Sequence, residues 1–463
     1  MHRLHLHRSR WTAPACSIVG SATTAMQVAA LLTALAGAGA AQAVPSFASQ
    51  TGMPCEQCHT VGYGPALTPY GRQFKLNGYV WGEGKTMPVA LMVQGGYTKI
   101  KADLPEPLAD HTSVNNNLSM DQASLFLAGR ISEHIGGFAQ ITYSGPDRAT
   151  SWDNVDLRYA HPMAFGDNSA VVGVSINNSP TAQDLWNSTP TWGYPYIGSE
   201  LAPTPGTSAM LGGLGQSVLG ASVYAMFNDR YYVELGAYRG MSDRWLKNVG
   251  LDGDANVHMV GAAPYARAAI QFDGPVRHAS IGLVALDAKF EPDASIGLRD
   301  RYTDIGLDAT YQWLPNGPHQ LSINAALTHE KRSLDASVQL EQASNVSSNL
   351  TFFSFDATYA YERTWSVAAG VFSSHGDSDS TLYSVQPLEG SLNGKPDSRG
   401  YSLQLEYIPF GKEKSLWRPW LNVRTGLQYV GYSKFNGGND NYDGFGRSAS
   451  DNNTLFAYLW IIL

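Results

Sequence analysis

Two cysteines and a histidine stand within five residues in the stretch TGMPCEQCHTVGYG, as Cys55, Cys58 and His59. The C-x-x-C-H spacing is the attachment signature of a c-type haem. Each thiol adds to one vinyl group of the porphyrin, and the histidine that follows directly is held beneath the ring, where it binds the iron. The motif therefore predicts one covalently attached haem c, with Cys55 and Cys58 as thioether attachment points and His59 as the proximal iron ligand.

Other interpretations of the two cysteines need features that the sequence lacks. A thioredoxin-like redox pair needs a βαβ setting, and no such pattern surrounds the motif. A zinc ribbon needs a second C-x-x-C, but the third cysteine of the chain is the isolated Cys16. Haem attachment is therefore the favoured chemistry.

The second axial ligand of the iron is less sharply defined by the sequence. Met87 lies after the helix predicted below and is the first choice, while Met53, Met92 and His111 are alternatives. A methionine in this position would raise the reduction potential relative to ligation by two histidines.

The stretch LTPYGRQFKLNGY, which follows the motif, predicts a short helix. Thr68 is the expected N-cap, Pro69 the first helical residue and Gly78 the stop. An ordinary amphipathic helix would carry similar residues, so a role in haem binding is one of two interpretations. Four of its side chains are candidates to touch the haem, two at the ring and two at the propionates: Phe74, Leu76, Arg72 and Lys75.

The chain begins with a basic and then apolar leader. Three arginines precede AMQVAALLTALAGAGAAQA, which ends in a small-x-small site, and this order predicts a secretory signal peptide over residues 1–43. A membrane anchor is the alternative, although the apolar stretch is short for a span. We therefore predict an exported protein with a haem segment over residues 44–88 and a second region over residues 89–463.

The composition limits the class of protein. Of the 463 residues, 15% are charged, compared with about 25% in ordinary soluble domains. The net charge is −8, which argues against nucleic acid as a partner.

The region after residue 88 alternates between apolar and polar residues. TDIGLDATYQW, for example, places Ile305 and Leu307 on one face and Asp304 and Asp308 on the other. Short links alternate with long ones, which is typical of outer-membrane barrels. We predict an all-β fold, an antiparallel porin-like barrel of about sixteen strands with the helical haem segment plugging its lumen. The predicted strands begin near Val89, Gln122, Gly136, Trp152, Ser169, Leu211, Arg230, Asn256, Val276, Arg301, His319, Leu350, Thr364, Arg399, Pro419 and Asn453.

The chain resembles the fused outer-membrane cytochrome–porins, the monohaem iron-oxidising cytochromes of iron-oxidising bacteria and their relatives. The likeness rests on residues 44–79, on NNSPTAQDLWNSTPTWGYPY at 177–196 and on the NNTLFAYLW ending, and it extends over the mature chain. The resemblance implies a haem segment in or at the mouth of a sixteen-stranded porin, with Cys55, Cys58 and His59 matching the haem motif. It also implies electron transfer across the bacterial outer membrane, from an extracellular donor such as Fe(II) to a periplasmic cytochrome or other carrier.

Two further regions are candidates for function. Acidic loops at residues 376–380 and 437–453 would attract Fe(II), although solvated loops or weak calcium sites explain them as well. The stretch at 177–196 falls in a long loop where general porins fold a segment inward, and its aromatic residues either pack on the haem segment or pack within the loop itself. These aromatic residues are Trp186, Trp192, Tyr194 and Tyr196.

The favoured function is therefore electron transfer with outer-membrane lipid, an extracellular donor and a periplasmic carrier as partners. No hydrolytic or group-transfer site is visible, and whether the chain counts as an Fe(II)-oxidising enzyme stays open. The main alternative is a substrate-selective porin whose haem is structural or sensory. A haem peroxidase would need a distal acid–base group, and the sequence reveals no clear one.

Overall fold

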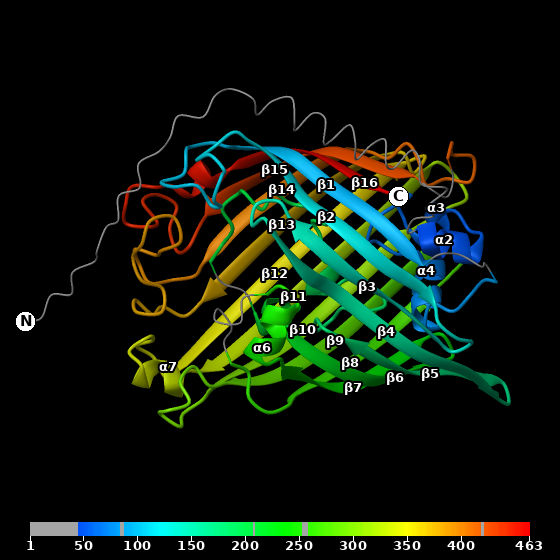
Figure 1. Ribbon diagram of the computed structural model, residues 1–463, viewed down its shortest axis with the longest axis horizontal. Coiled ribbons are helices and arrows are strands. Elements are labelled where there is room, and N and C mark those ends of the chain that lie inside the picture. The colour runs from blue at the N-terminus through cyan, green and yellow to red at the C-terminus, as the bar shows by residue number, and fades with distance from the viewer. Residues whose placement is uncertain (1–44, 84–87, 207–208, 252–257, 418–420) are drawn as a thin grey trace, which may run out of the picture. The chain divides into compact units, whose positions relative to one another are not determined.

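Figure 1 shows the computed structural model of the chain. The structure describes residues 45–83, 88–206, 209–251, 258–417 and 421–463. The predicted signal peptide and Met87 therefore lie outside the described residues, and both stay predictions.

Sixteen antiparallel strands close into one barrel. Each strand pairs with its neighbours in the sequence, and β1 closes the ring by pairing with β16, for example through Met92 and Ile462. Closure leaves no strand edge unpaired, and the predicted all-β barrel of sixteen strands is confirmed. The strands are β1 (Val89–Ile100), β2 (Asn117–Arg130), β3 (Ile135–Ser144), β4 (Ala149–Phe165), β5 (Asn168–Asn177), β6 (Val218–Phe227), β7 (Tyr231–Gly240), β8 (Ala263–Asp273), β9 (Arg277–Phe290), β10 (Asp300–Trp313), β11 (His319–Ser333), β12 (Ser347–Tyr361), β13 (Trp365–Gly376), β14 (Ser398–Tyr407), β15 (Asn422–Lys434) and β16 (Thr454–Ile462).

Most predicted strand starts agree with the structure to within a few residues. The start expected at Leu211 is wrong, because Met210–Gly213 forms the short helix α5 and β6 begins only at Val218. The starts expected near Asn256 and Pro419 lie outside the described residues; β8 begins at Ala263 and β15 at Asn422. A four-residue helix therefore occupies the position where the sequence predicted the start of a strand.

The two faces of each strand differ in polarity. On β10, Ile305 and Leu307 point outward and are half exposed, while Asp304 and Asp308 point into the barrel and are buried. The same alternation places Leu403 of β14 outside. The outside of the barrel is thus apolar and the lumen polar, which is the reverse of a water-soluble barrel and the arrangement of a membrane-spanning one.

Aromatic residues also gather on the outside next to the short turns. Tyr361, Trp365 and Tyr407 are exposed on three neighbouring strands, and the rings of Trp365 and Tyr407 lie 4.5 Å apart. Such a girdle marks the interface between lipid and water. Together with the apolar outer face, it identifies an outer-membrane barrel. No helix within the described ranges is long and apolar enough to cross a membrane.

The links between strands divide the barrel into two ends. Short turns at residues 166–167, 228–230 and 274–276 lie at one end, and long loops such as 377–397 and 435–453 lie at the other. By the convention of outer-membrane barrels, the short turns are periplasmic and the long loops extracellular. The remaining helices are α2 (Pro45–Thr51), α3 (Cys55–Cys58), α4 (Pro69–Leu76), η1 (Pro190–Trp192), α6 (Asp243–Asn248), α7 (Asp335–Gln339) and η2 (Ala449–Asn452).

The N-terminal helical segment lies at the short-turn end of the barrel, where α2, α3 and α4 gather beside the end of β16 (Figure 1). Glu56 of α3 accepts a hydrogen bond of 2.8 Å from Arg363, which belongs to the turn between β12 and β13. The backbone N–H of Glu56 also donates to the carbonyl of Gly411, in the link between β14 and β15. The segment is therefore held by several of the periplasmic turns.

The link between β5 and β6 folds into the barrel, and its described residues, 178–206 and 209–217, are called the inner loop below. Asp184 pairs with Arg267 of β8 at 3.1 Å between Oδ1 and Nη2. On the opposite wall, Gln428 of β15 donates a hydrogen bond of 2.8 Å to the carbonyl of Ile197. The inner loop therefore crosses the lumen from one wall to the other.

Candidate haem-binding site

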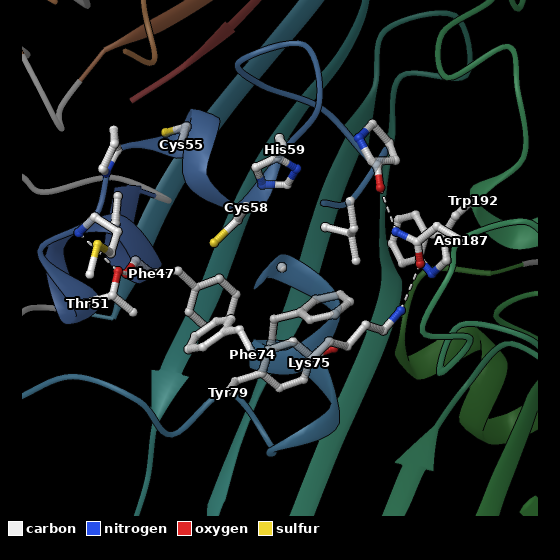
Figure 2. Close-up of a pocket in the computed structure, with 17 residues that line it drawn as sticks. Phe47, Thr51, Cys55, Cys58, His59, Phe74, Lys75, Tyr79, Asn187 and Trp192 are labelled. Carbon is white, nitrogen blue, oxygen red and sulfur yellow. Dashed lines mark hydrogen bonds between the residues drawn. The ribbon is translucent and has the colours of Figure 1, made fainter. Parts of the chain in front are cut away.

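The C-x-x-C-H segment lines a cavity with an empty volume of about 870 Å³, including open solvent at its mouth (Figure 2). Cys55, Cys58 and His59 all reach this cavity, which is called the haem-side cavity below. Its wall is mostly apolar. The contributing apolar side chains are Phe47, Pro65, Leu67, Phe74 and Tyr79 from the N-terminal segment, with Phe138 from β3 and Trp192 from the inner loop.

The helix that supports the motif begins and ends as predicted. The side-chain oxygen of Thr68 accepts a hydrogen bond of 3.2 Å from the backbone N–H of Gly71, and Pro69 is the first helical residue. The helix ends at Leu76, and Gly78 follows with a positive φ of 74°. A glycine takes this conformation at little cost, which confirms the predicted stop.

Gly71 lets α4 pack directly on the backbone of the motif. A Cβ atom built on this glycine would lie 2.3 Å from the carbonyl oxygen of Cys58. That oxygen also accepts a hydrogen bond of 2.9 Å from the backbone N–H of Thr68. Glycine in a helix interior costs stability, so its presence here is explained by this close approach.

His59 is partly buried, and its imidazole is neutral at physiological pH. Burial lowers its pKa to about 4, and the Arg424 guanidinium acts in the same direction, while the backbone carbonyls of Gly64 and Ala66 offset part of the effect. These carbonyls do not form a hydrogen bond with Nδ1, which is buried without a partner among the described residues. A neutral imidazole is the form that binds a metal, so the residues present fit a haem iron ligand.

The two cysteines lie in different surroundings. Burial, and then the neighbouring Cys55, raise the pKa of the Cys58 thiol to about 12. Redox-active dithiols depend on a lowered thiol pKa, so this environment disfavours a thioredoxin-like pair. The Cys55 sulfur accepts a contact of 3.4 Å from Nδ2 of Asn422, at the start of β15.

The candidates for the second axial ligand are spread over the molecule. Met53 lines the haem-side cavity. Met92 points into the barrel, where its sulfur accepts a 3.5 Å contact from Gln94, and it does not line the cavity. His111 lies in the loop between β1 and β2, at the long-loop end of the barrel. Geometry therefore removes Met92 and His111 as ligands and leaves Met53 beside Met87.

Arg72 is already paired within the protein, in contrast to the expected role at a haem propionate. Its Nη2 lies 2.8 Å from a carboxylate oxygen of Asp273, and its Nη1 donates to Gln312 at 2.9 Å. Gln312 in turn donates to the carbonyl of Leu67 at 2.8 Å. Arg72 therefore anchors α4 to the barrel wall.

Lys75 is bound in the same way by the inner loop. Its ammonium group donates to the carbonyls of Ala182 and Asp184, at 2.9 and 2.6 Å, and to the side chain of Asn187 at 3.0 Å. When the side chain is protonated, these bonds use all three of its protons. Lys75 still lines the haem-side cavity, but its amine group holds the inner loop.

The two apolar candidates of α4 also separate. Phe74 lines the haem-side cavity as expected. Leu76 is buried instead against Trp186 and Tyr224, on the other side of the helix. The expectation that Leu76 faces the ring is therefore wrong. Side chains two positions apart in an α-helix point to nearly opposite sides, so Leu76 points away from the cavity that Phe74 lines.

The inner loop completes the cavity wall. Of its four aromatic candidates, Trp192 lines the cavity, whereas Trp186 packs on Tyr232 with ring centroids 5.5 Å apart. Asn187 also lines the cavity and donates a hydrogen bond of 2.6 Å to the carbonyl of Pro65. Sequence reasoning missed Asn187, Phe138 and the tight packing at Gly71, and only the glycine left a signal, as an isolated Gly within a helical pattern.

In the acidic loops, as in the rest of the described residues, no three His, Cys, Asp or Glu side chains are grouped so that they could hold a metal ion. Asp379 instead accepts hydrogen bonds from the backbone N–H groups of Ser344, Asn345, Thr381 and Leu382. Its carboxylate therefore organises the neighbouring loops.

Comparison with known proteins yields only distant matches. No protein-family model and no curated protein matches the chain. Among solved structures, OmpF of Salmonella typhi, in complex with daunomycin, has 12% sequence identity and a TM-score of 0.46, over 81% of this chain and 97% of that one. The anion-selective porin of Comamonas acidovorans has 12% identity and a TM-score of 0.42, over 81% and 98%. The channel DcaP of Acinetobacter baumannii has 10% identity and a TM-score of 0.42, over 81% and 96%.

Proposed function

We propose that the chain is an outer-membrane c-type cytochrome–porin that carries electrons between an extracellular donor, Fe(II), and a periplasmic electron carrier. The observation that supports the proposal is the convergence of Cys55, Cys58 and His59 on one apolar cavity. A haem attached there supplies one-electron redox chemistry. The neutral, partly buried imidazole of His59 suits a ligand of its iron.

The other residues of the site hold the motif and limit its contact with water. Phe47 and Phe74 pack edge to face with centroids 5.1 Å apart, and Tyr79 stacks on Phe47 at 5.4 Å. An apolar shell of this kind controls the local dielectric and the reduction potential of a metal group. The position of the segment among the periplasmic turns suits exchange of electrons with a soluble periplasmic carrier.

Haem attachment is tested first, with the full-length chain produced in cells that attach c-type haem in the periplasm. Cys55→Ser with Cys58→Ser should abolish covalent haem staining on a denaturing gel, whereas Cys16→Ser, which alters a residue of the predicted leader, should leave it unchanged. Haem staining of the double variant at the level of the original chain would refute the assignment.

The donor is tested separately on the haem-loaded protein. Added Fe(II) should convert its optical spectrum to the reduced form. If dithionite reduces the haem and Fe(II) does not, the protein is a cytochrome but Fe(II) is not its electron donor. The two parts of the proposal can therefore fail independently.

A substrate-selective porin with a structural haem is the second candidate. The closed barrel and its polar lumen favour it, but the inner loop and the N-terminal segment both occupy the lumen or its mouth. Conductance of the purified protein in a planar bilayer distinguishes the two functions. The electron-transfer proposal expects little solute flux, and a large open-channel current would favour the porin.

A further inference from the structure

A second cavity lies on the other side of the inner loop and is called the outer cavity. Its empty volume is about 1730 Å³, including open solvent at its mouth. Pro190, Gly193 and Tyr194 line it, whereas their neighbours Asn187 and Trp192 line the haem-side cavity. One layer of the inner loop therefore separates the two cavities.

The outer cavity belongs to the extracellular half of the barrel. Its wall includes Phe352 of β12, Phe372 of β13 and Tyr432 of β15, each nearer to the long-loop end of its strand than to the short-turn end. The first residues of β14 and β16, Ser398 and Thr454, also line it. A solute from outside the cell would reach this cavity before the haem-side cavity.

The wall of the outer cavity carries no formal charge. Among its described lining residues there is no Asp, Glu, Lys, Arg or His. Elsewhere the lumen is rich in buried charge, as in the ion pair of Arg424 with Glu406 at 2.5 Å and that of Arg267 with Asp308 at 2.8 Å. Neutrality is therefore a local property of this cavity.

The polar groups of the wall are hydroxyls and one amide, and its apolar groups are mainly aromatic rings. Ser354, Ser374, Ser402, Thr328 and Gln428 supply polar atoms. The inward-facing rings stand at angles to one another, as in the pair Phe372 and Tyr432, whose centroids are 5.7 Å apart at 74° between planes. The aromatic lining residues that point inward are Tyr194, Phe352, Phe372, Tyr432 and Phe456.

We infer that the outer cavity binds neutral aromatic molecules that carry hydroxyl groups. A flat ring packs well against the edges and faces of aromatic side chains, and ligand hydroxyls pair with the serine and threonine groups. A charged ligand would lose its hydration without gaining an ionic partner. Small-molecule sites commonly combine such an apolar lining with a few polar groups. This inference does not depend on haem and goes beyond the proposed electron transfer.

The test uses the full-length protein in lipid nanodiscs and resorcinol, a neutral dihydroxybenzene, as the probe. Binding is measured by saturation-transfer NMR, with protein-free nanodiscs as the blank for partition into lipid. We expect saturable binding of resorcinol that an excess of benzoate, of similar size but anionic, does not displace. Displacement of resorcinol by benzoate, or a signal no greater than that of the blank, overturns the inference.

Two phenylalanines of β12 provide a matched pair of variants. Phe352 lines the outer cavity, whereas Phe355 points outward, is 40% exposed and does not line the cavity. Phe352→Ala should weaken resorcinol binding roughly fivefold, the equivalent of about 1 kcal/mol for one aromatic contact, and Phe355→Ala should leave it unchanged. An equal effect in both variants, or none in either, contradicts the site.

Ser374→Asp gives an independent check if Phe352→Ala does not fold, as judged by the heat-dependent mobility of the barrel on gels. A carboxylate in the neutral wall should weaken resorcinol binding and admit a cationic analogue such as benzylammonium. Unchanged binding of both probes would overturn the inference.

Discussion

Replacement of Gly71 by alanine tests how closely α4 packs on the C-x-x-C-H motif. The added Cβ would lie 2.3 Å from the carbonyl oxygen of Cys58, whereas real Cβ atoms essentially never approach closer than 3.0 Å. The two must therefore separate by at least 0.7 Å, the difference between these distances. This carbonyl also accepts the hydrogen bond from Thr68 at 2.9 Å, so the separation disturbs the start of the helix as well.

The sign of the effect is what makes this variant informative. In an unhindered helix, Gly→Ala stabilises by about 1 kcal/mol. Overpacking against backbone costs about 1–3 kcal/mol, and loss of the Thr68 hydrogen bond costs about 1 kcal/mol more. For Gly71→Ala we therefore expect a net destabilisation of about 1–3 kcal/mol, opposite in direction to helix propensity.

The assay follows the haem segment and the barrel separately. Covalent haem per folded barrel is read from haem-stained gels run without heating, and the stability of the segment from the Soret band during urea titration. Gly198→Ala is the control, because nothing lies within 4 Å of a Cβ built there. If Gly71→Ala keeps full haem content and resists urea better than the original chain, the packing argument is wrong.

Three further predictions concern other parts of the molecule. Burial, and then Arg158, lower the pKa of Lys75 from 10.5 to about 7. Between these two pH values the unfolded chain binds a proton that the folded chain lacks. The free energy of unfolding should therefore rise with pH, by at most about 1.4 kcal/mol per pH unit. Lys75→Met should remove that slope in urea unfolding from pH 7 to 10, and an unchanged slope would exclude Lys75 as its source. Optical spectra of Met53→Ala and Met87→Ala should reveal the second axial ligand, with Met92→Ala as the unaffected control, and we expect the change in Met87→Ala; three unaltered spectra would exclude methionine ligation by these residues. Leu307→Arg should cost about 2–4 kcal/mol of barrel stability, because Leu307 faces outward from the middle of β10; a neutral result would place this face outside the lipid.

The barrel was predictable from the sequence because its signal is local. A two-residue period is visible within each strand, as in the outward Ile305 and Leu307 beside the inward Asp304, and it needs no knowledge of distant residues. The cap at Thr68 and the stop at Gly78 are local for the same reason. Local patterns of this kind determine most of the fold.

The partners of the haem segment were not predictable because they lie far away in the sequence. Arg72 forms an ion pair with Asp273, and Lys75 donates hydrogen bonds to the carbonyls of Ala182 and Asp184. Nothing in the amphipathic pattern of α4 distinguishes a lysine that meets a propionate from one that meets a loop carbonyl. Those pairings depend on the register of the barrel and on the path of the inner loop through it.

The contacts at the end of α4 argue that the haem segment and the barrel fold as one unit. The last carbonyls of a helix lack partners within it, and here two of them are bound by the barrel wall. Arg158 donates to the carbonyl of Lys75 at 3.2 Å, and Tyr224 donates to that of Leu76 at 2.8 Å.

The segment in turn stabilises the barrel wall. Tyr79 donates a hydrogen bond of 2.7 Å to Asp156, which also pairs with Arg158 at 2.9 Å, and all three side chains are buried. Removing the segment would expose this ion pair to the lumen and take away one of its donors, while the free segment would lose the two hydrogen bonds from the wall to the end of its helix. A segment this short also lacks the surface to enclose a haem by itself. The cavity forms where the segment, β3 and the inner loop meet, so the C-x-x-C-H motif needs the barrel to complete the wall of its cavity.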